Sequence, residues 1–255
     1  MSPTGWDTGT AEAGALGRAA MILGAFDEDH RELTLAALSQ RSGLPRSTTH
    51  RTADTMIRLG WLDKPEHRYR IGNRLFELSG LAPIRHELRE AVLPYLQDLH
   101  HATRITVQLG VLDGPRVLVV EKITGHRQMP MLSQVGGTLP AYCSALGRAI
   151  LAWSDEETVD TVIAAGLPAR TPRTLTSPVA LRRELAAIPD RGWAVEREEG
   201  NIGLSCVGAP IFGPLGDVVA ALSVTGPTGL VRADRAGPAV RMAAAAASRA
   251  YAPRR

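Results

Sequence analysis

The sequence has few cysteines and no long apolar run. Its two cysteines, Cys143 and Cys206, form neither a CxxC pair nor a cysteine–histidine cluster with zinc spacing. We therefore expect two reduced, largely buried thiols in a cytosolic protein and no metal site. No apolar stretch approaches the 18 residues of a membrane-spanning helix, and residues 1–14 lack the basic and then apolar pattern of a signal peptide. These features predict a cytoplasmic protein that has no contact with a membrane.

Common catalytic motifs are also missing. The sequence contains no P-loop, dinucleotide fingerprint, HExxH or GxSxG, so we predict that the chain is not an enzyme and needs no cofactor. The alternative is a cysteine-dependent enzyme with a DNA-binding-like N-terminal domain. In it Cys206 would be the nucleophile and one of the scattered histidines, such as His100, the base. Because a lone cysteine on an apolar strand usually packs in a core, we prefer the first interpretation.

Net charge is low overall but not locally. The formal charge of all 255 residues is only +3, so any contact with nucleic acid must be a local patch. Between Arg46 and Arg74, seven basic residues face only the acids Asp54, Asp63 and Glu66, a local excess of +4. A basic stretch of this kind is typical of a surface that lies against a phosphate backbone.

The N-terminal region has the pattern of three short helices and a hairpin. Apolar spacing predicts helices over 15–26, 33–43 and 47–59, with Leu16 and Leu59 among the inward-facing residues. Thr34 is a plausible N-cap, and Gly43 should end the second helix. Residues 61–72 alternate around a Lys-Pro-Glu-His turn, as in a short β-hairpin. Together these elements predict a winged helix-turn-helix.

The third helix of this region has the side chains that a recognition helix requires. Short hydroxyls and arginines gather in its first turns, where such groups reach base edges and phosphates. An ordinary solvated helix face, or a helix-turn-helix that docks protein, is the competing interpretation, and the basic hairpin argues against both. The DNA-binding candidates are Arg46, Ser47, Thr48, His50 and Arg51 in the helix, and Lys64, Arg68 and Arg70 in the hairpin.

The remaining residues indicate a linker and a larger α+β domain. Residues 73–104 are helical with interruptions at Pro83 and Pro94, and a strand hairpin over 106–123 turns at Asp113-Gly114-Pro115. Further strands are expected near 193–198, 204–212 and 218–226. Helices are expected from Ser144, from a Ser154/Glu157 capping box, from Ser177, and over 232–251. This pattern predicts an α+β fold with a central antiparallel sheet flanked by helices. The expected division is 1–12 disordered tail, 13–74 winged helix-turn-helix, 75–92 linker helix and 93–255 effector-binding domain.

Three stretches in this order resemble the IclR family of bacterial transcriptional regulators. They are "LAALSQRSGLPRSTTHRTADTMIRLGWL", "LPAYCSALGRAILA" and "RGWAVEREEGNIGLSCVGAPIFGPLGDVVAALSVTGP". The resemblance covers residues 14–251. It implies a GAF-like effector domain, a homodimer or homotetramer on a partly palindromic operator, and repression or activation in response to a small organic acid or aromatic metabolite.

The resemblance also implies where the effector binds. Carried onto this sequence, the candidates are Ala145, Leu146, Glu196, Cys206, Ser223 and Thr225. Backbone amides at the start of the helix that carries Ala145 could hold a carboxylate, and Ser223 and Thr225 share one face of their strand. The bulk of Leu146 and the negative charge of Glu196 favour a larger or less charged effector over a very small acid. We expect effector binding to change operator affinity through the linker helix, with a coupling energy of about 1–3 kcal/mol.

Overall fold

The computed structural model describes residues 14–27, 29–81, 83–125 and 133–251, so the predicted disordered tail at 1–12 lies outside it. The chain divides into two compact units, residues 1–83 and 84–255. None of the helices in the described ranges is long and apolar enough to cross a membrane.

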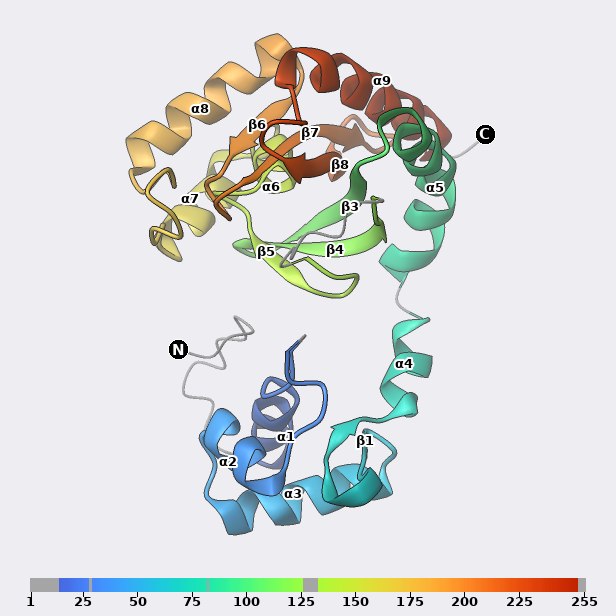
Figure 1. The fold of residues 1–255 in the computed structure, drawn as a ribbon, viewed down its shortest axis with the longest axis vertical. Helices are drawn as coiled ribbons and strands as arrows, with labels where there is room; N and C mark the ends of the chain where they lie inside the picture. Colours follow the sequence, from blue (N-terminus) through green and yellow to red (C-terminus); the bar gives the residue numbers. More distant parts are fainter. Residues whose placement is uncertain (1–13, 28, 82, 126–132, 252–255) are drawn as a thin grey trace. The chain divides into compact units, whose positions relative to one another are not determined.

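The first unit is built on three helices, with the second and third joined by a tight turn (Figure 1). Thr34 caps the second helix as expected, because its hydroxyl accepts a hydrogen bond from the amide of Ala37 at 3.3 Å. Gly43 ends that helix with a φ of 70°, a left-handed conformation that glycine adopts without strain. The helices are α1 (Ala15–Leu23), α2 (Leu35–Ser42) and α3 (Arg46–Arg58).

A small apolar core holds these helices together. It includes Ile22 and Leu38, which are fully buried, and Ala53 and Met56 from the inner face of α3. Two expectations about this core were wrong, since Leu16 is 78% exposed and Leu59 is 55% exposed. Leu16 lies one turn before the part of α1 that packs, and Leu59 follows the end of α3, so helical spacing alone misjudged both.

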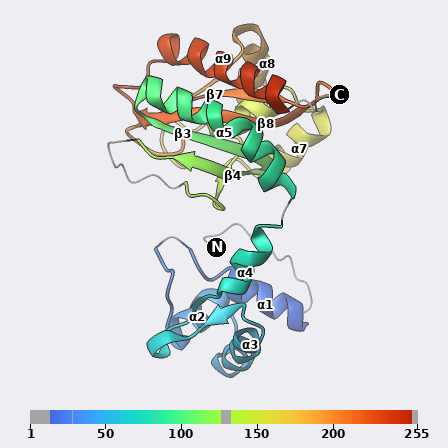
Figure 2. The same ribbon diagram turned by 90° about the vertical axis from the view of Figure 1, so that its right-hand side faces the viewer.

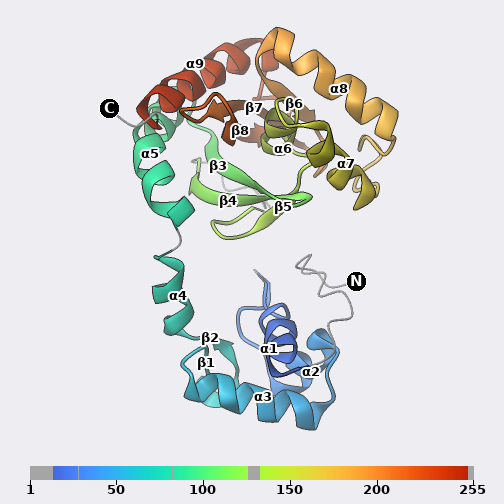
Figure 3. The same ribbon diagram turned by 180° about the vertical axis from the view of Figure 1, so that it is seen from behind.

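The predicted hairpin forms a short wing, labelled in Figure 3. Strands β1 (Leu62–Asp63) and β2 (Arg70–Ile71) pair antiparallel, and a 3-10 turn at Pro65–His67 joins them. Tyr69 is fully buried, and its backbone pairs with Leu33 before α2. The wing is therefore anchored to the helical core, while its basic side chains point outward.

Two helices span the predicted linker region, α4 (Asn73–Ser79) and α5 (Pro83–Thr103). A new helix begins at Pro83, as expected. Pro94, however, lies inside α5 and does not interrupt it. Pro94 is on the exposed side of the helix, where water can satisfy the carbonyl that its missing N–H would have bonded. The opposite side of α5, with Val92 and Leu96, is fully buried.

The second unit is built around a six-stranded antiparallel sheet in the part of the chain described, with the order β5-β4-β3-β8-β7-β6. The hairpin turn at Asp113–Pro115 and the turn at Gly216-Asp217 form where the sequence predicts them. The strands are β3 (Thr106–Asp113), β4 (Arg116–Ile123), β5 (Thr138–Pro140), β6 (Ala194–Arg197), β7 (Leu204–Phe212) and β8 (Val218–Pro227).

Helices cover both faces of this sheet, as the expected α+β arrangement requires. On one face α5 and α9 (Ala233–Tyr251) pack on Val107, Leu109, Val207 and Val224 (Figure 2). The helices on the other face form a second core with sheet residues such as Val117 and Ala221. They are α6 (Ala145–Leu151), α7 (Glu156–Ala164) and α8 (Pro178–Arg191).

Helix caps in this second core follow the sequence with one exception. Ser177 caps α8 as expected, but Asp155 and not Ser154 caps α7, through its carboxylate and the amide of Thr158 at 2.9 Å. The hydroxyl of Ser154 donates instead to the carbonyl of Ile150 in α6. Because α6 and α7 follow each other so closely, Ser154 serves the end of the first helix and Asp155 the start of the second.

Candidate DNA-binding surface and effector site

Helix α3 exposes most of the side chains that the sequence singled out. Arg46, Ser47, His50 and Arg51 are exposed, and Thr48 is half-buried. The opposite side holds Thr49, whose buried hydroxyl donates to the carbonyls of Leu44 and Pro45 at 3.2 and 3.1 Å. This contact fixes the start of α3 against the turn, so its exposed face is held on a rigid support.

The basic side chains of this surface are not equally free. Within the described ranges, the guanidinium groups of Arg46, Arg51 and Arg68 have no ion-pair partner or hydrogen-bond acceptor. His50 lies 3.1 Å from Asp54, and Arg70 lies 3.5 Å from Asp63. The ammonium group of Lys64 sits 4.7 Å from the centre of the Tyr69 ring. Arg51 is therefore the central unpaired cation on the exposed face of α3.

The predicted effector residues lie on one face of the sheet in the second unit. Thr225, Cys206 and Glu196 are direct cross-strand neighbours on β8, β7 and β6. A second row, two residues along the strands, joins Ser223 to Gly208 and Gln108. Neighbouring strands are about 4.8 Å apart, so the two rows form a compact polar patch. This face is opposite to the one that α5 and α9 cover.

Helix α6 brings the two remaining candidates onto this patch. A side chain at position 208 would lie only 2.7 Å from the carbonyl oxygen of Ala145 and 3.3 Å from the amide of Leu146. Glycine at this position is what lets the start of α6 rest on β7. Ala145 and Leu146 are therefore next to the row that contains Ser223, and both are buried. Of the first-turn amides of α6, that of Gly147 is already bound to the hydroxyl of Ser144.

Within the described part of the chain, some polar groups in this patch have hydrogen-bond partners and one does not. The hydroxyl of Thr225 lies 3.3 Å from the side-chain oxygen of Gln108 and 3.2 Å from the sulfur of Cys206. By contrast, the hydroxyl of Ser223 is fully buried and has no hydrogen-bond partner among the described residues. A buried hydroxyl left unpaired costs free energy, so this group is suited to a bound molecule.

The pKa values of Glu196 and Cys206 are both shifted in the direction that favours the uncharged form. Burial raises the pKa of the Glu196 carboxyl, and the amides of Glu199 and Gly200 partly oppose this by donating to its Oε1 at 2.5 and 3.0 Å. Burial, together with Glu196, also raises the pKa of the Cys206 thiol well above its usual value. A thiol that resists ionisation is a poor nucleophile, which argues against the cysteine-enzyme alternative.

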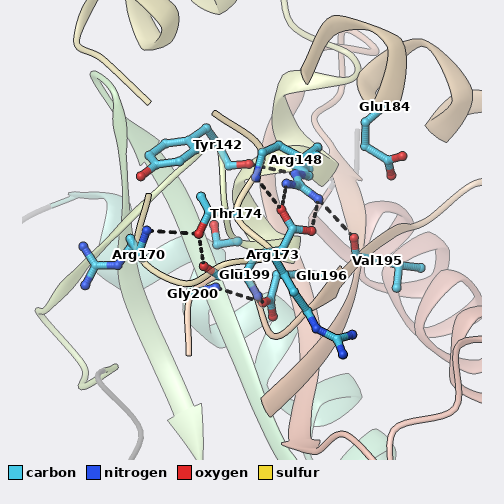
Figure 4. Close-up of polar contacts among 12 residues, drawn as sticks. Tyr142, Arg148, Arg170, Arg173, Thr174, Glu184, Val195, Glu196, Glu199 and Gly200 are labelled. Atoms are coloured by element: carbon cyan, nitrogen blue, oxygen red, sulfur yellow. Dashed lines mark hydrogen bonds and ion pairs between the residues drawn. The ribbon is translucent and has the colours of Figure 1, made fainter. Parts of the chain in front are cut away.

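A buried ion pair beside this patch was not foreseen from the sequence. Arg148 in α6 donates to both carboxylate oxygens of Glu199, with Nη1 at 2.7 Å from Oε1 (Figure 4). Its Nε also donates to the carbonyl of Tyr142 at 2.7 Å, and its side chain is 1% exposed. Glu199 in turn donates its amide to Glu196, so the pair ties α6 to the loop that follows β6.

Gln108 is a second residue that the sequence analysis missed. It is 2% exposed, and its amide donates to the hydroxyl of Ser133 at 2.5 Å. The available signal was a polar residue on the inward side of an otherwise apolar strand, in "TVQLGV". No comparable signal existed for Arg148 and Glu199, which are 51 residues apart in the sequence.

Two solved structures of IclR proteins share this architecture. An IclR homologue from Microbacterium hydrocarbonoxydans, complexed with 4-hydroxybenzoate, superposes with a TM-score of 0.84 at 30% identity. It matches 93% of this chain and 99% of that one. The Thermotoga maritima IclR has a TM-score of 0.73 at 27% identity, over 94% of this chain and 97% of that one. Both matches extend over the two units.

Sequence comparisons agree. The IclR helix-turn-helix domain matches residues 15–66, and the bacterial transcriptional regulator IclR C-terminal domain matches residues 82–250. The Escherichia coli regulator XynR is 33% identical over 211 residues, which are 82% of this chain and 84% of that protein. The E. coli transcriptional repressor IclR is 32% identical over 238 residues, 89% of this chain and 84% of that protein. This chain therefore belongs to the IclR family of bacterial transcriptional regulators, with a helix-turn-helix domain and a C-terminal effector-binding domain, and is not an enzyme.

Proposed function

We propose that this regulator works in the cytoplasm as a homodimer on a partly palindromic operator, and that a small organic carboxylate changes its operator affinity or activity. The observation that carries the effector part is the buried, unpaired hydroxyl of Ser223 in a polar patch of the sheet. The DNA part rests on the exposed face of α3, with Arg51 unpaired at its centre.

The polar patch supports a carboxylate with an apolar body. Ser223 offers an unpaired hydroxyl beside the polar side chains of Thr225 and Gln108, while the buried Leu146 supplies an apolar wall. Because burial raises the pKa of Glu196 and two amides hold its Oε1, its charge opposes a bound anion less than the sequence suggests. The Microbacterium homologue is complexed with 4-hydroxybenzoate, which makes this compound the first probe for the present protein.

Replacing Ser223 by alanine should have opposite effects on stability and binding. Removing an unpaired buried hydroxyl relieves a desolvation cost, so the free energy of unfolding should stay equal or rise by up to about 1 kcal/mol. The affinity for 4-hydroxybenzoate should fall about tenfold, the equivalent of one hydrogen bond. Thermal unfolding and isothermal titration calorimetry measure the two quantities.

Ser205→Ala is the matched control. Ser205 is 2% exposed on the next strand but donates its hydroxyl to Thr228 at 3.1 Å. Its loss should lower stability by about 1 kcal/mol and leave 4-hydroxybenzoate binding unchanged. If Ser223→Ala destabilises the protein as Ser205→Ala does and binds the probe as tightly as wild type, Ser223 has no role in effector binding.

Exposed apolar side chains in the first unit support the dimer. Phe76 of α4 is 78% exposed and Leu81 just after it is 77% exposed. Exposed apolar patches often mark protein–protein contacts, and Phe76 and Leu81 would contribute to such a patch between two copies. We expect Phe76→Ser to shift the protein toward the monomer in light scattering and to weaken operator binding at least tenfold. Met242→Ser, which changes a 70% exposed residue of α9, is the control. A Phe76→Ser protein that stays dimeric excludes this surface.

The whole proposal is tested by fluorescence anisotropy on duplexes tiled across the upstream region of the gene. One tile should bind tightly and lose affinity as salt rises, because neutralised phosphates release counterions. Adding 4-hydroxybenzoate or another small carboxylate should change that affinity by about 5- to 150-fold. A panel of carboxylates that changes neither operator affinity nor transcription from the bound promoter contradicts the effector part and leaves DNA binding standing.

A further inference from the structure

A cavity lies in the second unit, lined by none of the residues of the polar patch. It is open to solvent on one side, where Arg241 and Ala245 are exposed, and has a volume of about 310 Å³, roughly the space of ten water molecules. Its walls come from the end of β7, from α9 and from the segment after α6. The residues that matter for the argument are Trp153, Pro210, Phe212, Arg241, Ala245 and Ser248.

The cavity lies where the edge of the sheet is open. Strand β6 pairs with residues 205–208 of β7, so the part of β7 from Ala209 to Phe212 extends beyond it. Pro210 has no backbone N–H to offer there, and the amide of Phe212 donates to the hydroxyl of Ser248 at 2.9 Å. The backbone at this edge is therefore not available for another strand, which favours a small molecule over an added peptide.

The walls are aromatic and apolar, with one cation. The rings of Trp153 and Phe212 meet edge to face with centroids 5.8 Å apart. The guanidinium carbon of Arg241 lies 6.0 Å from the ring centre of Trp193. Arg241 has no acidic partner within the described ranges, and none of the lining residues is acidic. Apolar walls with one placed polar group are typical of small-molecule sites.

We propose that this cavity binds a small planar carboxylate, distinct from the effector in the polar patch. The carboxylate would pair with the guanidinium of Arg241, and the apolar body would rest on Trp153 and Phe212. An arginine held beside an aromatic ring is preorganised for such an anion.

The position of the cavity allows a ligand bound there to influence the polar patch through α6. Ala145 and Leu146 at the start of α6 lie on the polar patch, and Trp153 follows the end of the same helix. All seven residues of α6 are buried, so a shift at one end of the helix is transmitted to the other. Occupancy of the cavity should therefore change affinity at the effector site, and the reverse change should be equal.

The test uses the full-length protein with benzoate as the probe and benzamide as its uncharged counterpart. The four tryptophans give four indole N–H signals in a nitrogen-15 spectrum, and Trp153→Phe identifies that of Trp153. We expect benzoate to shift the Trp153 and Trp193 signals in a saturable way and not that of Trp61 in the other unit. Benzamide should bind at least tenfold more weakly. The shifts should persist in Ser223→Ala, which changes only the polar patch.

Two pairs of variants localise the binding. Ala245→Leu fills the cavity from an exposed position, and Arg241→Gln removes its charge; each should weaken benzoate binding at least tenfold. Ala250→Leu and Arg249→Gln make the same changes on exposed positions of α9 outside the cavity and should match wild type. The proposal would be overturned by equal affinities in all four variants or by the absence of a Trp153 shift at 10 mM benzoate. It would also be overturned by a Trp153 shift that follows protein concentration without benzoate. The last result would make the cavity a contact between copies.

Discussion

Arg51→Ala is expected to weaken operator binding by roughly 5- to 150-fold, a loss of about 1–3 kcal/mol. The reason is that Arg51 is exposed on α3 and its guanidinium has no ion-pair partner within the described ranges. It therefore reaches DNA without first breaking an internal contact. By contrast, His50 must leave Asp54 and Arg70 must leave Asp63. Fluorescence anisotropy at two salt concentrations measures the loss.

The salt dependence separates two kinds of contact. If Arg51 binds a phosphate, the negative slope of log K against log salt should become shallower by about 0.9 in Arg51→Ala. If it binds a base edge, the slope should stay and discrimination against altered operators should relax. Arg58→Ala is the control, because it removes the same charge from the end of the same helix, where Arg58 donates to Thr55. Equal affinities for Arg51→Ala and Arg58→Ala would exclude Arg51 from the interface.

Local sequence signals predicted local structure well. The hydroxyls of Thr34 and Ser177 cap their helices because an N-cap needs only an amide three residues ahead. The turn at Gly43 needs only a residue that tolerates a positive φ. The predicted burial of Leu16 and Leu59 was wrong. Burial depends on which neighbours cover a residue, and helical spacing does not contain that information.

The candidate sites show the same limit. The sequence selected an exposed helix face, and α3 does expose it. It also selected Ser223, Thr225 and Cys206, which the sheet register brings together. Whether these residues bind DNA and effector is still a prediction. Arg148 and Glu199 were missed because only the folded chain brings together residues from α6 and from the loop after β6. The unpaired state of Ser223 was equally invisible, since it depends on every neighbour at once.

Arg148→Ala is expected to have the largest effect on stability. Removing one partner of a buried ion pair leaves the other charge without compensation, at a cost of about 3–5 kcal/mol. Among the described residues, Glu199 would keep only the amide of Leu175, 3.3 Å away, as a donor to its carboxylate. For a protein of this size the melting temperature of the second unit should fall by roughly 6–20 °C, which calorimetry can measure.

The control is an ion pair at the surface. Arg182, which pairs with Glu156 and Asp160 between α8 and α7, is 35% exposed. Because exposed pairs contribute little, Arg182→Ala should cost at most about 1 kcal/mol. A melting temperature of Arg148→Ala within 2 °C of that of Arg182→Ala would mean that the buried pair adds no more than the exposed one.

A double variant separates the charge from the packing. Replacing Arg148 and Glu199 together by methionine and leucine removes both charges, and such replacements are often neutral or stabilising. The double variant should therefore recover most of the stability that Arg148→Ala loses. It should still bind effector more weakly than wild type, because Glu199 positions the backbone amides that hold Glu196 at the edge of the polar patch. A double variant that is stable but binds effector weakly would show that the Arg148–Glu199 pair supports effector binding by holding the loop after β6 in place.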